Sequence, residues 1–289
     1  MLRKIYKKIA PLMGDKSFNL INYRYLYAKL GLRAPTIDYV NPKRFNHKIL
    51  WLKMNYRHLN AALYADKVLV KDWVSKSIGS DFIIPTIGVW DDAFDIDFSE
   101  LPDSFILKAN HGSGWNILVP DKQALNEVEA KKKLNFWLNC NYFDIGREYQ
   151  YQHIEPKILA EPLLDPGEGK QLLDYKFFCF NGEPHFVQVD IDRHASHSRN
   201  FYDLSWNRVP LQILYPTHPD NPDRPANFDR MIEIVKKLSI GFPFIRVDLY
   251  DCAGRIYFGE LTFHPEGGFG PIQPDEWDEK LGEMLKLPA

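Results

Sequence analysis

The chain has 289 residues, of which 45% are hydrophobic and 26% are charged, so it contains enough apolar material for one large core or for two lobes. No stretch approaches the roughly 20 consecutive apolar residues that span a bilayer. The first residues, MLRKIYKKIAPLMG, lack the uninterrupted apolar segment of a secretory signal. We therefore expect a cytoplasmic globular protein.

Positive charge is concentrated in the first part of the chain. Residues 1–60 hold thirteen Lys and Arg against two Asp, a balance of +11, and the remaining residues hold 23 against 36, a balance of −13. A basic end favours peripheral contact with an anionic glycan or with the inner face of a membrane. The alternative is a solvated helix face opposite the apolar stripe from Leu2 to Leu12. Both interpretations of the basic region stay open. Nucleic acid is not an expected partner.

Apolar spacing predicts helices in the first 80 residues, at 17–31, 44–55 and 61–79. Short apolar runs at 105–109 and 115–119 then enclose the polar sequence HGSG, which is typical of two strands joined by a tight turn. In residues 122–139 the apolar residues again have helical spacing, which predicts a helix. We expect a helical region at 1–80 and a small strand-containing lobe at 81–160.

The second half of the sequence is richer in strand patterns. Strands are predicted at 158–164, 174–180, 184–192, 243–250 and 255–263, with a helix at 228–240. Asn181-Gly182 between alternating apolar runs is a strong hairpin signal. Helices early and antiparallel strand pairs late indicate an α+β fold, with a larger lobe at 161–289.

The last two predicted strands carry polar side chains in otherwise apolar surroundings, namely Arg246, Asp248, Glu260 and Thr262. A five-residue loop at 251–255 would pair Arg246 with Glu260 and place Asp248 diagonal to Glu260, with backbones about 7–8 Å apart. Two carboxylates at that separation suit Mg²⁺. The alternative is an Arg246–Glu260 ion pair with Asp248 exposed to solvent.

A glycine-containing loop forms a second candidate site. Lys108 precedes His111-Gly112-Ser113-Gly114-Trp115-Asn116, and two glycines let backbone amides approach phosphate oxygens while a nearby lysine adds positive charge. The pattern is neither a Walker A loop nor GxGxxG, so the alternative of a hairpin turn that binds no ligand stays open. Asp174 and Lys176 share a strand face and are either part of a site or a surface pair.

Taken together, these segments resemble the TupA-like ATP-grasp family, which is linked to teichuronopeptide and other surface polysaccharides. The resemblance covers about residues 35–289. It rests on motifs in a fixed order: RFNHKILWLKMN, ADKVLVKDWV, LPDSFILKANHGSGWNILV, LLDYKFFCFNG, the RVDLY strand and YFGELTFHPEGGF.

The resemblance implies an ATP-grasp fold, in which two α+β lobes with antiparallel sheets enclose a nucleotide cleft. ATP would be bound by Lys67, Lys108 and the glycine loop, including the loop residues His111, Gly112, Ser113, Gly114 and Asn116, with Glu161 at the adenine. Mg²⁺ would be bound by Asp248 and Glu260. Thr262 stands where many relatives have asparagine, which puts a second metal ion in question. Arg246, Lys176 and Arg193 are the candidate catalytic residues, because cations suit carboxylates and phosphoryl groups.

The implied activity is that of an ATP-dependent carboxylate–amine ligase, which forms an acylphosphate and then an amide in cell-surface polysaccharide biosynthesis. Its substrates would be an acidic sugar or related carboxylate and an amino acid or other amine. One alternative is a glycosyltransferase with a DxD site at Asp190-Ile191-Asp192 or at Asp95-Ile96-Asp97. A second is a non-catalytic polysaccharide assembly protein that retains the fold.

Overall fold

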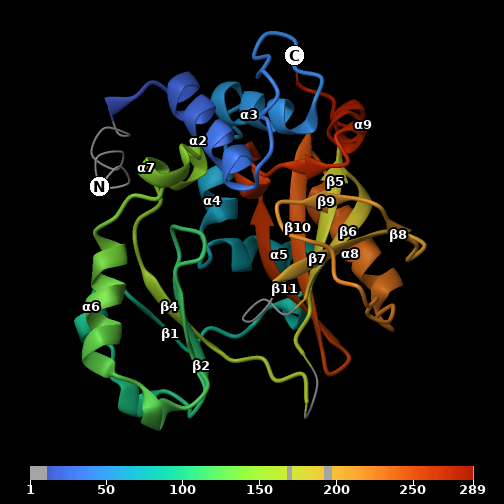
Figure 1. Cartoon of the computed structure of the whole chain (residues 1–289). Helices are drawn as coiled ribbons and strands as arrows, with labels where there is room; N and C mark the ends of the chain where they lie inside the picture. The colour runs from blue at the N-terminus through green and yellow to red at the C-terminus, as the bar shows by residue number, and fades with distance from the viewer. Residues whose placement is uncertain (1–11, 168–170, 192–196, 289) are drawn as a thin grey trace. The chain divides into compact units, whose positions relative to one another are not determined.

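The computed structural model describes residues 12–167, 171–191 and 197–288 (Figure 1). Contacts divide the chain into two compact units. Unit 1 consists of Met1–Arg57, Leu173–Leu249 and Leu261–Ala289, and unit 2 consists of His58–Leu172 and Tyr250–Glu260. The predicted regions 1–80, 81–160 and 161–289 do not coincide with these units, because residues 12–57 pack with the second half of the chain.

Unit 2 is built on a four-stranded antiparallel sheet with strand order β1-β4-β2-β3. The apolar positions of β2 face a core that includes Leu107, Leu134 and Trp137, and helix α6 packs on this sheet (Figure 1). The predicted strands around the HGSG loop are confirmed, with Lys108 paired to Asn116. The elements are α4 (Ala61–Ala65), α5 (Val70–Ile78), β1 (Gly88–Trp90), β2 (Phe105–Ala109), β3 (Asn116–Val119), α6 (Glu127–Leu138), α7 (Phe143–Gly146) and β4 (Ile158–Pro162).

Unit 1 contains most of a six-stranded sheet with order β11-β10-β5-β6-β7-β8. Phe45 packs against Phe178, Phe180 and Phe244 in its core, and α8 contacts β5 and β6. The elements are α2 (Asp15–Lys29), α3 (Phe45–Asn55), β5 (Asp174–Phe180), β6 (Glu183–Ile191), β7 (Ser198–Asp203), β8 (Arg208–Val209), β9 (Gln212–Ile213), α8 (Phe228–Ser239), β10 (Phe244–Cys252), β11 (Arg255–Thr262), β12 (Ile272–Gln273) and α9 (Glu276–Met284). The β10–β11 tip, residues 250–260, belongs to unit 2.

Short 3-10 helices connect several of these elements. They lie at Ser80–Phe82, Ala93–Asp95, Phe98–Glu100, Lys122–Ala124, Tyr149–Tyr151 and Pro265–Gly268. Both units combine helices with antiparallel strand pairs, so the α+β prediction is confirmed. Within the described ranges, no helix is long and apolar enough to cross a bilayer. The apolar stripe from Leu2 to Leu12 lies almost entirely outside the described residues.

The two hairpin predictions have different outcomes. At Asn181-Gly182 both residues have positive φ, 52° and 87°, and β5 and β6 join directly across them, as Asn-Gly predicts. The five-residue loop predicted at 251–255 is wrong. Strand β10 continues to Cys252 and β11 begins at Arg255, because Ala253 and Gly254 both have positive φ and form a two-residue turn.

The helix predicted at 61–79 is interrupted. Helix α4 ends at Ala65, and the Asp66 side chain accepts hydrogen bonds from the backbone N–H groups of Val68 and Leu69. This local turn competes with helix continuation. It also fixes the backbone on both sides of Lys67.

Candidate functional site

Unit 2 brings three lysines and one glutamate together. Lys108 extends from β2 and Glu161 from the adjacent β4, and Lys108 Nζ lies 2.5 Å from Glu161 Oε2. Lys71, from α5, contacts the other oxygen of Glu161. Burial opposes ionisation of Glu161, but Lys108 and Lys71 outweigh it and hold its pKa below the usual range. The carboxylate is therefore fixed as an anion between two cations.

Lys67 lies beside the glycine loop. Its Nζ donates a hydrogen bond to the carbonyl of Gly112, and burial lowers its pKa. Asn110 fixes the same region, since its Nδ2 donates to Asp66 Oδ2 over 2.9 Å. A Cβ on Gly112 would lie 2.6 Å from the Trp115 ring, so a larger residue does not fit there. The loop that the sequence singled out is therefore packed against Lys67.

The remaining loop residues fall into two groups. Ser113, Gly114 and Asn116 are exposed, as phosphate-facing groups would be. His111 is buried, with one ring nitrogen 3.0 Å from Asn110 Oδ1 and the other 3.0 Å from the Trp137 carbonyl. Its ring is engaged inside unit 2, so a role in nucleotide binding would involve its backbone.

Unit 1 contains a buried group of opposite charges on β5 and β10. Arg246 forms two hydrogen bonds with Asp248, each 2.7 Å long. Lys176 Nζ lies 2.9 Å from Asp248 Oδ2 and also contacts Asp174. These carboxylates and Lys176 are all buried, so the alternatives of an exposed Asp248 and of a surface Asp174–Lys176 pair are wrong. The predicted shared strand face of Asp174 and Lys176 is confirmed by the contact between these side chains.

The charged group continues through Asp190, Arg199 and Glu266, which are not among the predicted nucleotide, metal or catalytic residues of the ligase. Lys176 Nζ is 3.8 Å from Asp190 Oδ2, and Asp190 Oδ1 is 2.9 Å from Arg199 Nε. Arg199 Nη1 is 2.6 Å from Glu266 Oε1. The available signal was the polar side chains Gln188, Asp190 and Arg199 inside the apolar strands β6 and β7, because buried charges need partners.

The ion pairs occupy the carboxylate of one predicted metal ligand, Asp248. Both oxygens of Asp248 already accept hydrogen bonds from Arg246 and Lys176, and Arg246 also donates to the Thr262 hydroxyl over 3.0 Å. Among the described residues, no three His, Cys, Asp or Glu side chains converge as metal ligands would. As arranged here, Asp248 does not fit a magnesium ligand, and Mg²⁺ at Asp248, Glu260 and Thr262 stays a prediction.

Two further predictions concern DxD sequences and Arg193. Asp97 caps a 3-10 turn by accepting hydrogen bonds from the N–H and hydroxyl of Ser99, which is a structural role at the surface. Arg193 and Asp192 lie outside the described residues. The structure therefore gives neither of them a position.

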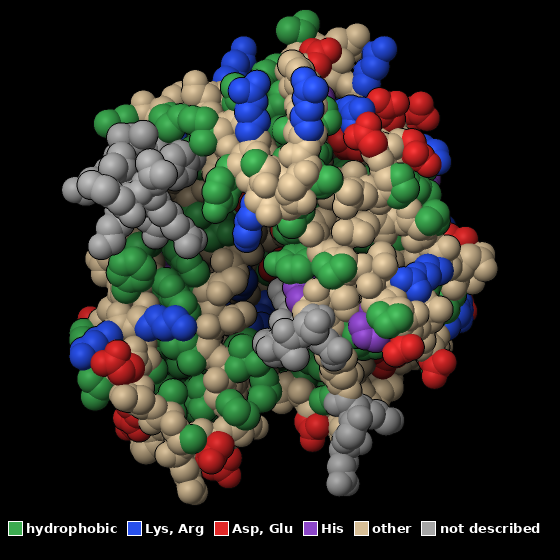
Figure 2. Space-filling model, in the orientation of Figure 1, with side chains coloured by type: hydrophobic (Ala, Val, Ile, Leu, Met, Phe, Trp, Pro, Cys, Tyr) green, Lys and Arg blue, Asp and Glu red, His purple; other side chains and the backbone are tan. Residues whose placement is uncertain are grey.

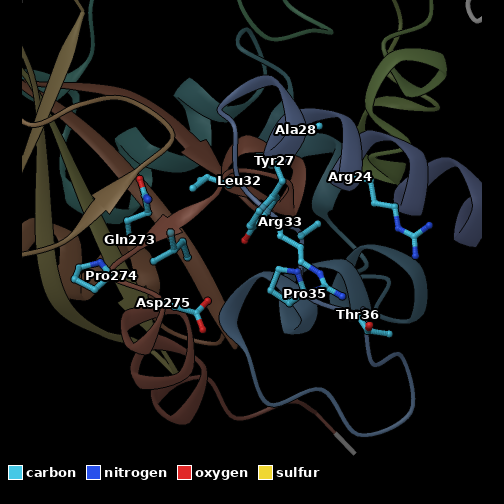
Figure 3. A pocket seen from close by; sticks show the side chains of 12 residues that line it. Arg24, Tyr27, Ala28, Leu32, Arg33, Pro35, Thr36, Gln273, Pro274 and Asp275 are labelled. Atoms are coloured by element: carbon cyan, nitrogen blue, oxygen red, sulfur yellow. The ribbon is translucent and has the colours of Figure 1, made fainter.

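A hollow of about 770 Å³ lies elsewhere in unit 1. Figure 3 shows Arg24, Tyr27 and Arg33, from α2 and the following segment, on one side and Asp275 on the other. Asp275 is bound by Arg44 at 2.6 Å, and acidic side chains gather on the surface near α9 (Figure 2). None of the predicted site residues lines this hollow.

Comparison with known proteins gives one family match. The model of the TupA-like ATP-grasp family matches residues 47–286, which is 240 of the 289 residues. No curated protein matches the sequence significantly.

Several solved structures are similar at low identity. D-alanine–D-alanine ligase from Bacillus anthracis, complexed with ATP, shows 14% identity and a TM-score of 0.43 over 77% of this chain and 63% of that chain. The ATP-grasp ligase PsnB, complexed with a minimal precursor, Mg and ADP, shows 12% identity and a TM-score of 0.41 over 83% and 64%. The chain thus spans less than two thirds of the length of either ligase.

Proposed function

Because the chain belongs to the TupA-like ATP-grasp family, we propose that it is an ATP-dependent carboxylate–amine ligase that acts in cell-surface polysaccharide biosynthesis. The observation that carries this proposal is the group of Lys67, Lys71 and Lys108 beside the glycine loop of unit 2. Three lysines grouped beside the loop suit an anionic ligand such as a phosphate. Backbone amides next to such lysines are typical of phosphate sites.

The proposed reaction has two steps. A substrate carboxylate oxygen attacks the γ-phosphorus of ATP, ADP leaves, and an acylphosphate forms. An amine then attacks the acyl carbon, phosphate leaves, the amine loses a proton, and an amide bond is formed. Phosphoryl transfer depends on positioning and on neutralising charge, and for this role we propose Lys108 and Lys67 at the nucleotide.

Arg246, Lys176 and Arg193 are proposed to act on the substrate carboxylate or on the transferred phosphoryl group. Arg246 and Lys176 support this with their charge and their fixed positions. In the present arrangement both bind Asp248, so a substrate anion would compete with that carboxylate. The proposal for Arg193 rests on the chemistry of its guanidinium group alone, because this residue lies outside the described residues.

A second candidate function is nucleotide binding without turnover. The specific observation in its favour is that Asp248, the expected metal ligand, is occupied by two cations. A protein of this kind would bind ATP and assist polysaccharide assembly without hydrolysing it.

Hydroxylamine trapping tests the ligase proposal. With ATP, Mg²⁺ and an acidic sugar or amino acid, we expect hydroxamate together with ADP and phosphate, and loss of this product in Glu260→Gln. AMP and pyrophosphate would indicate an adenylate instead. Sugar transfer from a nucleotide sugar without ATP would indicate the glycosyltransferase alternative, and ATP binding that raises Tm without turnover would favour the second candidate.

A further inference from the structure

Two arginine side chains in the described part of the chain have no partner. The described ranges contain eleven arginines. The side chains of nine of them take part in an ion pair, a hydrogen bond or a ring contact. The two exceptions are Arg24 and Arg33, and both line the hollow of about 770 Å³ in unit 1 (Figure 3). The unpaired guanidinium groups of the described residues therefore belong to one concave site.

The end of helix α2 fixes the wall that carries Arg33. Gly31 has φ 71°, and its N–H donates to the Ala28 carbonyl over 3.0 Å. The N–H of Leu32 donates to the Tyr27 carbonyl over 2.9 Å. These two hydrogen bonds end the helix and turn the chain back, and Leu32 packs against the buried cluster that contains Tyr27. This wall is thus held in place by the protein itself, which lowers the cost of ordering it around a ligand.

The one carboxylate among the lining residues is already neutralised. Arg44 Nη1 and Nη2 donate to Asp275 Oδ1 and Oδ2 over 2.6 and 2.7 Å, and a bidentate pair of this kind is strong. The other carboxylates beside Arg44, those of Asp278 and Glu279, are not among the lining residues. The two unpaired arginines of the lining are therefore the charges available to a ligand, and they suit an oxyanion.

Neutral groups complete the lining of the hollow. Gln273 Oε1 accepts a hydrogen bond from Gln212 over 3.4 Å, and among the described residues no acceptor pairs with the amide donors of Gln273. The hydroxyl of Thr36 is likewise without a partner there. Pro35 and Pro274 add apolar rings (Figure 3). A ligand that matches all these groups combines an oxyanion with hydroxyls and some apolar C–H surface.

We propose that the hollow binds an anionic sugar, with Arg24 and Arg33 at its carboxylate or phosphate and Gln273 and Thr36 at its hydroxyls. A guanidinium binds either oxyanion bidentately. The volume of about 770 Å³ lies within the range of roughly 300–1,000 Å³ that small-molecule sites occupy. The choice of a sugar among hydroxylated anions rests on the proposed function in polysaccharide biosynthesis.

The same residues distinguish between the two partners expected for the basic first part of the chain, an anionic glycan and a membrane. A hollow admits a small molecule or the end of a polymer, whereas a bilayer surface contacts protruding side chains. Because Arg24 and Arg33 line a hollow together with neutral hydrogen-bonding groups, the glycan is the partner that they fit.

Three probes with the same sugar ring test the charge requirement. Glucuronate carries a carboxylate, glucose 1-phosphate carries a phosphate, and glucose is neutral. Ligand-observed NMR titrations of the full chain without ATP measure the affinity of each probe. We expect wild type to bind at least one anionic probe about tenfold more tightly than glucose, and the preferred probe identifies the anion.

Four variants locate the binding site. Arg24→Gln and Arg33→Gln should each weaken binding of the anionic probe by about tenfold, and wild-type Tm should be kept because both side chains are exposed. Ala28→Trp fills the hollow from an exposed position without a change of charge, and it should weaken binding as well. The matched control is Lys29→Gln, which removes the same charge from α2 outside the lining residues and should keep the wild-type affinity.

Several results would overturn the assignment: equal affinity for glucose and the anionic probes, no binding of any probe, wild-type affinity in both arginine variants, or an equal loss in Lys29→Gln. Arginine-dependent binding to phosphatidylglycerol vesicles without binding of any sugar would assign these residues to a membrane instead. Failure of the ligase proposal is distinguishable, since hydroxamate would then be absent in wild type whether or not the sugar probes bind. Lys108→Ala should bind the probes as wild type does.

Discussion

Each unit holds a lysine among charged groups, half-buried Lys67 in unit 2 and buried Lys176 in unit 1, and the pKa values of the two lysines shift in opposite directions. Burial lowers the pKa of Lys67, and the nearby carboxylates do not compensate. Burial also opposes the charge of Lys176, but Asp174 and Asp248 outweigh it and raise its pKa above the usual range. The pKa of each lysine thus depends on whether the nearby carboxylates outweigh the cost of burying its charge.

This contrast shows how the local charges differ between the two units. Lys67 keeps a lowered pKa although Glu260, Asp66 and Glu161 act on it, so a nucleotide phosphate beside it would favour its charged form. The carboxylates around Lys176 already favour the charged form of that lysine. Four experiments challenge or refine this comparison, in order of decreasing effect.

Asp248→Asn should give the largest effect, because it leaves Arg246 and Lys176 without their shared partner. We expect the free energy of unfolding to fall by about 3–5 kcal/mol in urea denaturation. Asp95→Asn, an exposed control, should change stability by less than about 0.5 kcal/mol. A loss for Asp248→Asn as small as the control's would mean that the ion pairs contribute nothing.

Lys108→Ala should weaken ATP binding by about thirtyfold to a hundredfold, since it removes a charged donor beside the glycine loop. Calorimetric titration with ATP measures the dissociation constant. The matched control is Lys76→Ala, an exposed lysine of α5 that pairs with Asp72. Unchanged ATP affinity in Lys108→Ala would indicate that the loop is a hairpin turn without a ligand.

The lowered pKa values of Lys67 and Lys71 predict that ATP affinity depends on pH. The protonated lysines bind phosphate, so affinity should fall as pH rises through their lowered pKa values, by about tenfold for each lysine that loses its charge. Lys71→Arg keeps its charge throughout this range and should show a weaker pH dependence. An affinity that is constant with rising pH in wild type would contradict the assignment of these lysines.

Ser113→Ala should have the smallest effect. If backbone amides of the loop make most of the phosphate contacts, loss of the hydroxyl should change ATP affinity by less than about threefold. A loss comparable to that of Lys108→Ala would show that the side chain, rather than the backbone, binds the nucleotide.

Local patterns in the sequence were sufficient to predict the positions of several helices and strands. Periodicity located α2, α3 and α8, and the strands on both sides of HGSG. Asn181-Gly182 located a hairpin, because its residues tolerate the positive φ that a two-residue turn requires. Ala253 gave no such signal, since alanine seldom adopts positive φ, and the β10–β11 turn was therefore assigned the wrong length.

The charged residues inside apolar strands are evident from the sequence, and its motifs in order identified the family. The pairing of those charges follows from the three-dimensional arrangement of the strands and helices. Lys71 forms an ion pair with Glu161, and Arg199 forms ion pairs with Asp190 and Glu266. No local pattern predicts these pairs, because their members are not neighbours in the sequence. The physical reason is that periodicity fixes the face on which a side chain lies, whereas the partner of a buried charge depends on which strands become neighbours in the sheet.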